Sequence, residues 1–89
     1  MKTNCIEMRL INKEGIIRAI EKVYASKHKA INIRSTTKAI RAVNEKGENI
    51  FDAILGTDGV FTARVQGHYM TELYDALSKL REEVPTLDE

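Results

Sequence analysis

Residues 49–65, NIFDAILGTDGVFTARV, contain two runs of alternating apolar and polar residues on either side of the sequence TDG at 57–59. This pattern predicts two antiparallel strands joined by a tight connection. A two-residue turn would place Leu55 opposite Thr62 and mix apolar with polar residues on one face. A three-residue loop, with its final glycine in the left-handed conformation, places Leu55 opposite Phe61 and keeps each face uniform. The sequence therefore favours the three-residue loop.

The residues before this hairpin extend it to a three-stranded meander. A two-residue turn at Lys46-Gly47 places Arg41 opposite Asp52, which in turn lies opposite Arg64, so opposite charges alternate across three predicted strands. The face with this charged row, called the outer face below, is flanked by Val43, Ile50 and Ile54. The other face is predicted to be the core and carries Ile40, Ala42, Phe51, Ala53, Leu55, Phe61, Ala63 and Val65.

The segment before the meander is ambiguous. Ile31 and Ile33 have the wrong parity to continue the apolar face through Arg41. The sequence RSTTK at 34–38 is therefore expected to contain a bulge, a bend or a break between two strands.

Two helices and one further strand complete the expected fold. Residues 5–10 alternate as a strand does, and Asn12 is expected to cap a helix that ends near Ser26. After Gly67 the spacing of apolar residues again predicts a helix, which ends near Val84. The predicted fold is an α+β domain over residues 1–84, with two helices packed on an antiparallel sheet of three to four strands in the order (β)-α-β-β-β-α. Residues 85–89 form a short acidic tail.

Size and composition restrict the class of protein. A chain of 89 residues suits one domain, and no apolar run approaches the roughly 20 residues that a membrane helix needs. The N-terminal residues contain no apolar stretch of signal-peptide length, and a single cysteine, Cys5, excludes an internal disulfide. We therefore expect a cytoplasmic protein without a membrane segment.

The sequence contains no convincing arrangement for catalysis or metal binding. His28, His68 and Cys5 are far apart without metal-ligand spacing, and Cys5 is expected to be a small buried hydrophobe in an edge strand. The glycines around 56–59 fall in a hairpin loop instead of between a strand and a helix, so they do not predict a phosphate site. We expect a non-enzyme that needs neither metal nor cofactor.

The first functional hypothesis is a protein-interaction module. The outer face is too apolar for a pure solvent face and too polar for a core, which is typical of a surface that binds a partner protein or a second copy in a homodimer. The alternative is that the N-terminal strand or a helix covers it. The expected partner-binding residues are Arg34, Lys38, Arg41, Ile50, Asp52, Ile54 and Arg64. In size and in helix, three-strand, helix layout the chain is similar to phage-encoded inhibitors of host defence nucleases, which implies a stoichiometric inhibitor or regulator.

The second hypothesis is binding of RNA or DNA through residues 27–41, KHKAINIRSTTKAIR, which lack acidic residues. The candidate residues are Lys27, Lys29, Arg34, Lys38 and Arg41. The order of helix, three antiparallel strands and helix also resembles the double-stranded RNA-binding domain, whose second helix carries basic residues that clamp phosphates. The corresponding helix start here, GHYMTELYDA at 67–76, has Glu72 and Asp75 in place of those basic residues.

Overall fold

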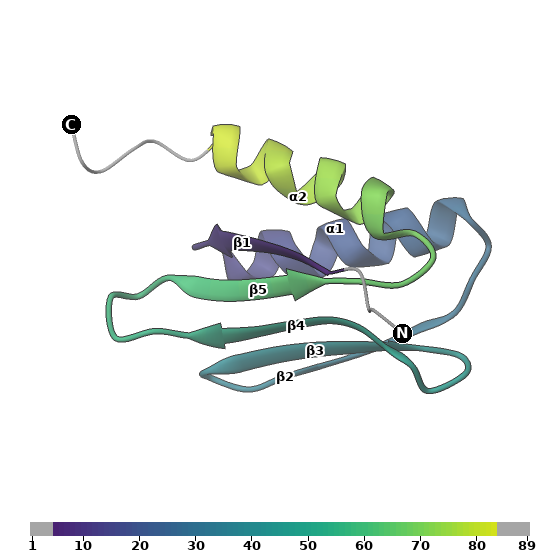
Figure 1. Cartoon of the computed structure of the whole chain (residues 1–89), viewed down its shortest axis with the longest axis horizontal. Helices are drawn as coiled ribbons and strands as arrows, with labels where there is room; N and C mark the ends of the chain where they lie inside the picture. Colours follow the sequence, from purple (N-terminus) through teal and green to yellow (C-terminus); the bar gives the residue numbers. More distant parts are fainter. Residues whose placement is uncertain (1–4, 84–89) are drawn as a thin grey trace.

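The computed structural model describes the backbone of residues 5–83 and the side chains of residues 5–80, and it shows an α+β fold (Figure 1). The elements are β1 (Ile6–Leu10), α1 (Lys13–Ser26), β2 (Ile31–Ser35), β3 (Ala39–Asn44), β4 (Asn49–Leu55), β5 (Phe61–Val65) and α2 (Met70–Glu83). Five strands form one antiparallel sheet in the order β1-β5-β4-β3-β2. The sheet thus has one strand more than the upper limit expected from the sequence, because both the N-terminal strand and an extra strand before the meander join it.

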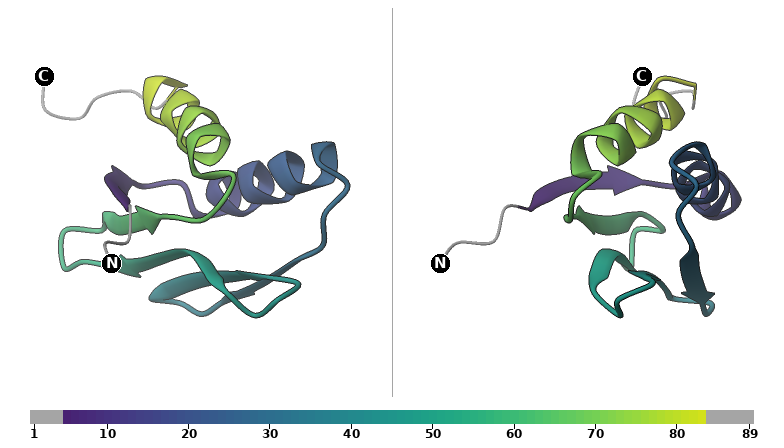
Figure 2. Two further views of the ribbon diagram at one scale, coloured as in Figure 1. Left: turned by 45° about the vertical axis from the view of Figure 1, so that its right-hand side comes forward. Right: turned by 90° about the vertical axis from the view of Figure 1, so that its right-hand side faces the viewer.

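Both helices lie on the same side of the sheet, as Figure 2 shows. Helix α2 packs on β1 and β5, whereas α1 packs on α2 and on β2. The core between the two layers is apolar. Its most deeply buried members are Ile16, Ile20, Ile40, Phe51, Val65, Leu73 and Leu77, together with Ile50.

The β4–β5 hairpin has the predicted register. Leu55 lies opposite Phe61, and Asp52 lies opposite Arg64. Gly59 has a φ of 81°, and its N–H donates to the carbonyl of Gly56 at 3.1 Å. The three-residue loop is therefore confirmed.

The β3–β4 connection differs from the prediction by one residue. Asn44 N–H donates to the Glu48 carbonyl at 3.0 Å and Gly47 N–H donates to the Asn44 carbonyl at 2.9 Å, so three residues, 45–47, form the loop instead of two. The Asn44 side chain stabilises this loop, since its Oδ1 accepts from the backbone N–H groups of Lys46 and Glu48. The predicted two-residue turn at Lys46-Gly47 is wrong.

A β-bulge in β4 compensates for the longer loop. Ala42 pairs with Phe51, but the next residue, Val43, pairs with Asn49, so Ile50 is the extra residue. The Ile50 side chain is 1% exposed and belongs to the core. The expectation that Ile50 lies on the outer face is therefore wrong, because a bulge turns two successive side chains toward the same side.

The ambiguous segment 34–38 contains a break between two strands. The chain reverses there, with Thr36 N–H donating to the Ala39 carbonyl at 2.8 Å, and β2 pairs antiparallel with β3. Ile33 lies opposite Ala42 on the core side. The parity of the two isoleucines changes because they belong to a separate strand.

Helix α1 begins as expected, with the Asn12 side chain accepting from Gly15 N–H at 2.9 Å. It ends at Ser26 in a Schellman arrangement, in which His28 N–H donates to the Ala25 carbonyl and Lys29 N–H donates to the Tyr24 carbonyl. His28 takes the left-handed position with a φ of 57°.

The described part of α2 reaches Glu83, while the predicted helix end near Val84 and the acidic tail 85–89 lie outside the described residues. Neither helix in the described part of the chain is long and apolar enough to cross a membrane.

Candidate functional site

The outer face of the sheet carries one row of charged residues that crosses all five strands. In strand order the row is Glu7, Arg64, Asp52, Arg41 and Arg34, each the cross-strand neighbour of the next. The charge alternates over the first four positions, and then two arginines stand side by side. Opposite charges at paired positions stabilise a sheet, whereas like charges destabilise it. An external carboxylate would therefore lower the free energy most if it bound beside the pair Arg41 and Arg34, where it would relieve the repulsion between the two arginines.

A second, less charged row lies beside the first. It contains Arg9, Thr62, Ile54 and Ala39, again as successive cross-strand neighbours. Ile54 is 65% exposed, the largest exposed fraction among the big hydrophobic residues of the described chain. β1 lies in the sheet and both helices pack on the opposite side, so no element within residues 5–83 covers Ile54.

The arginines of the charged row make no internal ion pairs in the described part of the chain. The ion pairs within 4.0 Å among residues 5–80 are Arg9 with Asp58 at 2.5 Å and Lys27 with Glu72 at 3.3 Å. Asp52 accepts a hydrogen bond from the side-chain amide of Asn49 at 3.0 Å. The guanidinium groups at 34, 41 and 64 therefore keep their hydrogen-bonding capacity for solvent or for a partner.

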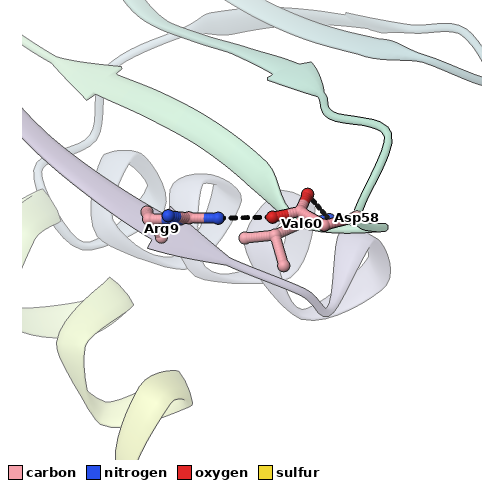
Figure 3. Close-up of polar contacts among 3 residues, drawn as sticks. All are labelled: Arg9, Asp58 and Val60. Carbon is pink, nitrogen blue, oxygen red and sulfur yellow. Dashed lines mark hydrogen bonds and ion pairs between the residues drawn. The ribbon is translucent and has the colours of Figure 1, made fainter.

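Arg9 is the exception among the outer-face arginines. Its guanidinium binds the Asp58 carboxylate in the β4–β5 loop, and the other carboxylate oxygen of Asp58 accepts from Val60 N–H at 3.1 Å (Figure 3). This contact ties β1 to the loop that closes the central hairpin.

Among the residues that the structure describes, every cation on a strand is an arginine, whereas the lysines lie in the helices and connections. The strand residues are Arg9, Arg34, Arg41 and Arg64, and each is exposed. Protein interfaces are enriched in arginine and depleted in lysine, because the planar guanidinium makes paired hydrogen bonds to carboxylates and is less strongly hydrated. The absence of lysine from the strands favours a recognition surface on the outer face, although the helices also contain two arginines, Arg18 and Arg81.

The basic stretch 27–41 does not form one surface. Lys27 lies after the C-terminal end of α1, where it binds Glu72 and its Nζ is 5.4 Å from the ring centre of Tyr69. Lys29 lies near the same helix end. Arg34 and Arg41 point to the outer face, and Lys38 lies in the β2–β3 turn next to Thr36.

The two ends of this stretch are far apart in the fold. The side chain of Lys13, at the N-terminal end of α1, donates to the Thr36 carbonyl in the β2–β3 turn at 2.7 Å. Because α1 has 14 residues, the turn and the helix exit at Lys27 are separated by about 20 Å. The structure therefore brings Arg34, Arg41, Asp52, Ile54 and Arg64 onto one face, with Lys38 at its border, and separates them from Lys27 and Lys29.

A pocket of about 350 Å³ opens where the end of α1, the β3–β4 loop and the start of α2 meet. Its lining combines Lys29 and Lys46 with Glu45 and Glu48, and it includes the rings of Tyr24, His68 and Tyr69. Tyr24 and Tyr69 meet edge to face with ring centres 5.4 Å apart. Burial, and then the neighbouring Tyr69, raise the pKa of Tyr24 above its ordinary value of 10.0. Charged side chains of both signs line the pocket, so it does not select a ligand of one charge.

The remaining reactive side chains do not form a site. No group of three or more metal-ligating side chains occurs among the described residues. His28 takes the left-handed backbone position that ends α1. His68 packs edge to face on Tyr69 with ring centres 4.8 Å apart. Cys5 is exposed, so the expectation that it is buried is wrong. It lies just before β1 and alternates in step with Glu7 and Arg9, which point away from the core.

Sequence reasoning missed the contribution of β1 to the outer face. The alternation of Glu7 and Arg9 with Ile6, Met8 and Leu10 already indicates that the two charged residues point away from the core. Their place beside Arg64 and Thr62 depends on the pairing of β1 with β5, and no local pattern encodes that pairing. A comparison of the chain with protein-family models, curated proteins and solved structures found no match in any of the three.

Proposed function

We propose that this protein is a small non-enzymatic interaction module that binds a protein partner through the outer face of its sheet and acts as a stoichiometric inhibitor or regulator. The observation that carries the proposal is the position of Ile54. This isoleucine is 65% exposed next to a row of charges on a sheet face that neither helix covers. An apolar centre beside arginines is typical of protein interfaces.

A protein partner fits the outer face better than a nucleic acid does. Asp52 lies between Arg41 and Arg64 in the charged row, and Glu7 follows on β1, so two carboxylates would face any phosphate backbone laid across the sheet. The outer face of the strands also carries no aromatic ring for stacking on bases, because Phe51 and Phe61 are buried on the core side. A protein with charges of both signs can satisfy all of these groups.

The similarity in size and in expected helix, three-strand, helix layout to phage-encoded inhibitors of host defence nucleases suggests the specific form of this role, and the structure adds a fourth strand between the two helices. In that form the protein would work in the cytoplasm and block a host enzyme by occupying its surface in a one-to-one complex. The free thiol of Cys5 suits a reducing compartment.

The test compares two aspartate substitutions at exposed isoleucines. Cross-linked partners are captured from lysates of the source cell with the wild type, with Ile54→Asp and with Ile11→Asp. Ile11 is 42% exposed and lies between β1 and Asn12, the N-cap of α1. We expect Ile54→Asp to weaken partner binding at least tenfold, about 1.4 kcal/mol, and Ile11→Asp to leave it unchanged. Circular dichroism checks that both variants are folded. Equal partner binding by all three proteins would overturn the proposal.

Binding to nucleic acid is measured in parallel. Affinities for duplex DNA, duplex RNA and single strands are determined over a salt series, and we expect no steep dependence on salt. A slope that corresponds to four or more phosphate contacts, lost in Arg34→Ala and Lys38→Ala, would replace the protein partner with a nucleic acid.

A further inference from the structure

We propose that a partner of the outer face is a second copy of this chain, bound face to face about a two-fold axis that runs along the strands between β5 and β4. The inference rests on the proposed function, since it identifies the partner of the same surface. It is carried by the order of charges in the row and by the neighbouring Ile54 and Thr62.

The charged row is complementary to itself when reversed. From β1 to β3 the charges are negative at Glu7, positive at Arg64, negative at Asp52 and positive at Arg41. A rotation about an axis parallel to the strands reverses this order and keeps the residues at the same height along the strands. With the axis between β5 and β4, Glu7 meets Arg41 of the other copy and Arg64 meets its Asp52. All four positions then face an opposite charge.

Other positions of the axis do not give this result. An axis on β4 would place Asp52 on its own symmetry mate and Arg64 on Arg41. An axis between β4 and β3 would place Arg64 on Arg34. Like charges in contact cost free energy, so of these three axis positions only the one between β5 and β4 avoids such contacts, and it covers more strands than an axis between β1 and β5 would.

The second row fits the same axis. The axis places β4 of one copy opposite β5 of the other, and β1 opposite β3. Ile54 on β4 therefore lies opposite Thr62 of the other copy, and Arg9 lies opposite its Ala39. Ile54 and the methyl group of Thr62 then form a small apolar centre on the two-fold axis. Arg9 faces no like charge there and remains bound to Asp58.

The geometry of packed sheets tolerates this pairing. Strands are about 4.8 Å apart, so β1 and β3 lie about 7 Å from the axis. Aligned sheets cross at about 30°, which displaces the outer pair, Glu7 and Arg41, by roughly 4 Å, within the reach of an arginine side chain. Arg34 on β2 lies beyond the edge of the other copy and stays exposed.

The size of the contact predicts a weak dimer. Four strands of about five residues cover on the order of 400 Å² of sheet surface per copy, about half of the ~800 Å² per partner found in standard interfaces. Much of the attraction is between charges that are screened by salt. We therefore expect association at protein concentrations of tens of micromolar or above and its loss at about 0.5 M salt.

The test uses two charge-reversal variants, each of which should dimerise weakly by itself, whereas a mixture of the two should dimerise. In Asp52→Arg, the new arginine meets Arg64 of the second copy, and in Arg64→Asp, the new aspartate meets its Asp52. The two-fold axis produces each of these like-charge contacts twice. In low-salt sedimentation each variant should therefore dimerise at least tenfold more weakly than the wild type. A mixture of the two variants restores an opposite charge at every position. Within each variant chain the altered charge still lies beside its unchanged cross-strand neighbours. Recovery of dimerisation on mixing must therefore come from contact between the two chains.

The mixing experiment is read by nuclear magnetic resonance on ¹⁵N-labelled Asp52→Arg. Addition of unlabelled Arg64→Asp is expected to shift amide signals of β5 and β4. The matched control is Lys79→Asp, an exposed helix position that gives the same net charge but leaves Arg64 in place, and it should not shift them. Asp75→Arg, the helix counterpart of Asp52→Arg, should dimerise as the wild type does. Thermal unfolding checks that each variant is folded.

Two results would overturn self-association: a wild type that stays monomeric at millimolar concentration and low salt, or equal effects of Arg64→Asp and Lys79→Asp on the labelled chain. If Ile54→Asp nevertheless removes a cellular partner that Ile11→Asp retains, the proposed function stands and only the second copy is wrong as the partner. If Ile54→Asp changes neither association, both proposals fail.

Discussion

Gly67 and Ile50 show how a single side chain constrains a distant backbone position. Gly67 follows β5 with a φ of 100°, and a Cβ built on it would lie 3.1 Å from Cγ2 of Ile50. Ile50 occupies this position because the bulge in β4 turns it into the core. Two separate requirements, a left-handed backbone and a close side chain, therefore fall on the same glycine.

The substitution Gly67→Ala should lower the free energy of unfolding by about 2 to 4 kcal/mol, because it combines backbone strain with displacement of Ile50. Gly47→Ala is the matched control, since Gly47 has a φ of 82° but nothing within 4 Å of a built Cβ. It should cost only the strain, about 1 kcal/mol. Urea unfolding measures both, and equal losses would contradict the contact with Ile50.

At the scale of elements, the β4–β5 hairpin could be predicted completely and the β3–β4 hairpin only in part. In the former, the apolar and polar faces distinguish the two loop lengths, so the pattern itself contains the answer. In the latter, the extra loop residue and the bulge at Ile50 cancel, and the pairs Arg41–Asp52 and Ala42–Phe51 are the same in either arrangement. A pattern that two geometries satisfy equally cannot choose between them.

The candidate site shows the same limit. Arg41, Asp52, Ile54 and Arg64 could be assigned to the outer face because they lie within consecutive hairpins. Glu7 could not be joined to them, since β1 reaches β5 across the whole length of α1 and the meander. Non-local pairing is decided by the packing of the complete sheet.

The contact between the helices predicts a dependence of stability on acid. A hydrogen bond from its own backbone N–H, and then the amine of Lys27, lower the pKa of Glu72 below its ordinary value of 4.5. At pH values between the folded and the unfolded pKa of Glu72, the native state binds fewer protons than the unfolded state. The contribution of Glu72 to the free energy of unfolding is therefore complete above about pH 4.5 and is lost as the pH falls through the folded pKa. The free energies of unfolding of the wild type and of Glu72→Gln should differ near neutral pH and converge once the pH falls below the folded pKa of Glu72. Parallel curves over this whole range would contradict the prediction.

At the scale of the whole molecule, the sheet order predicts an uneven resistance to opening. β4 pairs on both sides and lies under the core, whereas β2 pairs only with β3 and its residues are exposed or half-buried. We expect amide hydrogen exchange to be at least tenfold faster in β2 than in β4, because edge strands can open without loss of the core. Equal protection of the two strands would show that the domain opens only as a unit.

The order of the strands also has a consequence for the chain as it leaves the ribosome. β2 to β5 are consecutive hairpins that can pair as soon as each is made, but β1 is made first and pairs with β5, which ends at Val65. At about 5 to 20 residues per second, β1 waits roughly 3 to 11 s for its partner strand. During this time Met8 and Leu10, which are buried in the finished fold, have no sheet to pack on. Synthesis therefore leaves β1 to be the last strand added to the sheet, and its core-facing side chains stay without their final packing partners until β5 has been made.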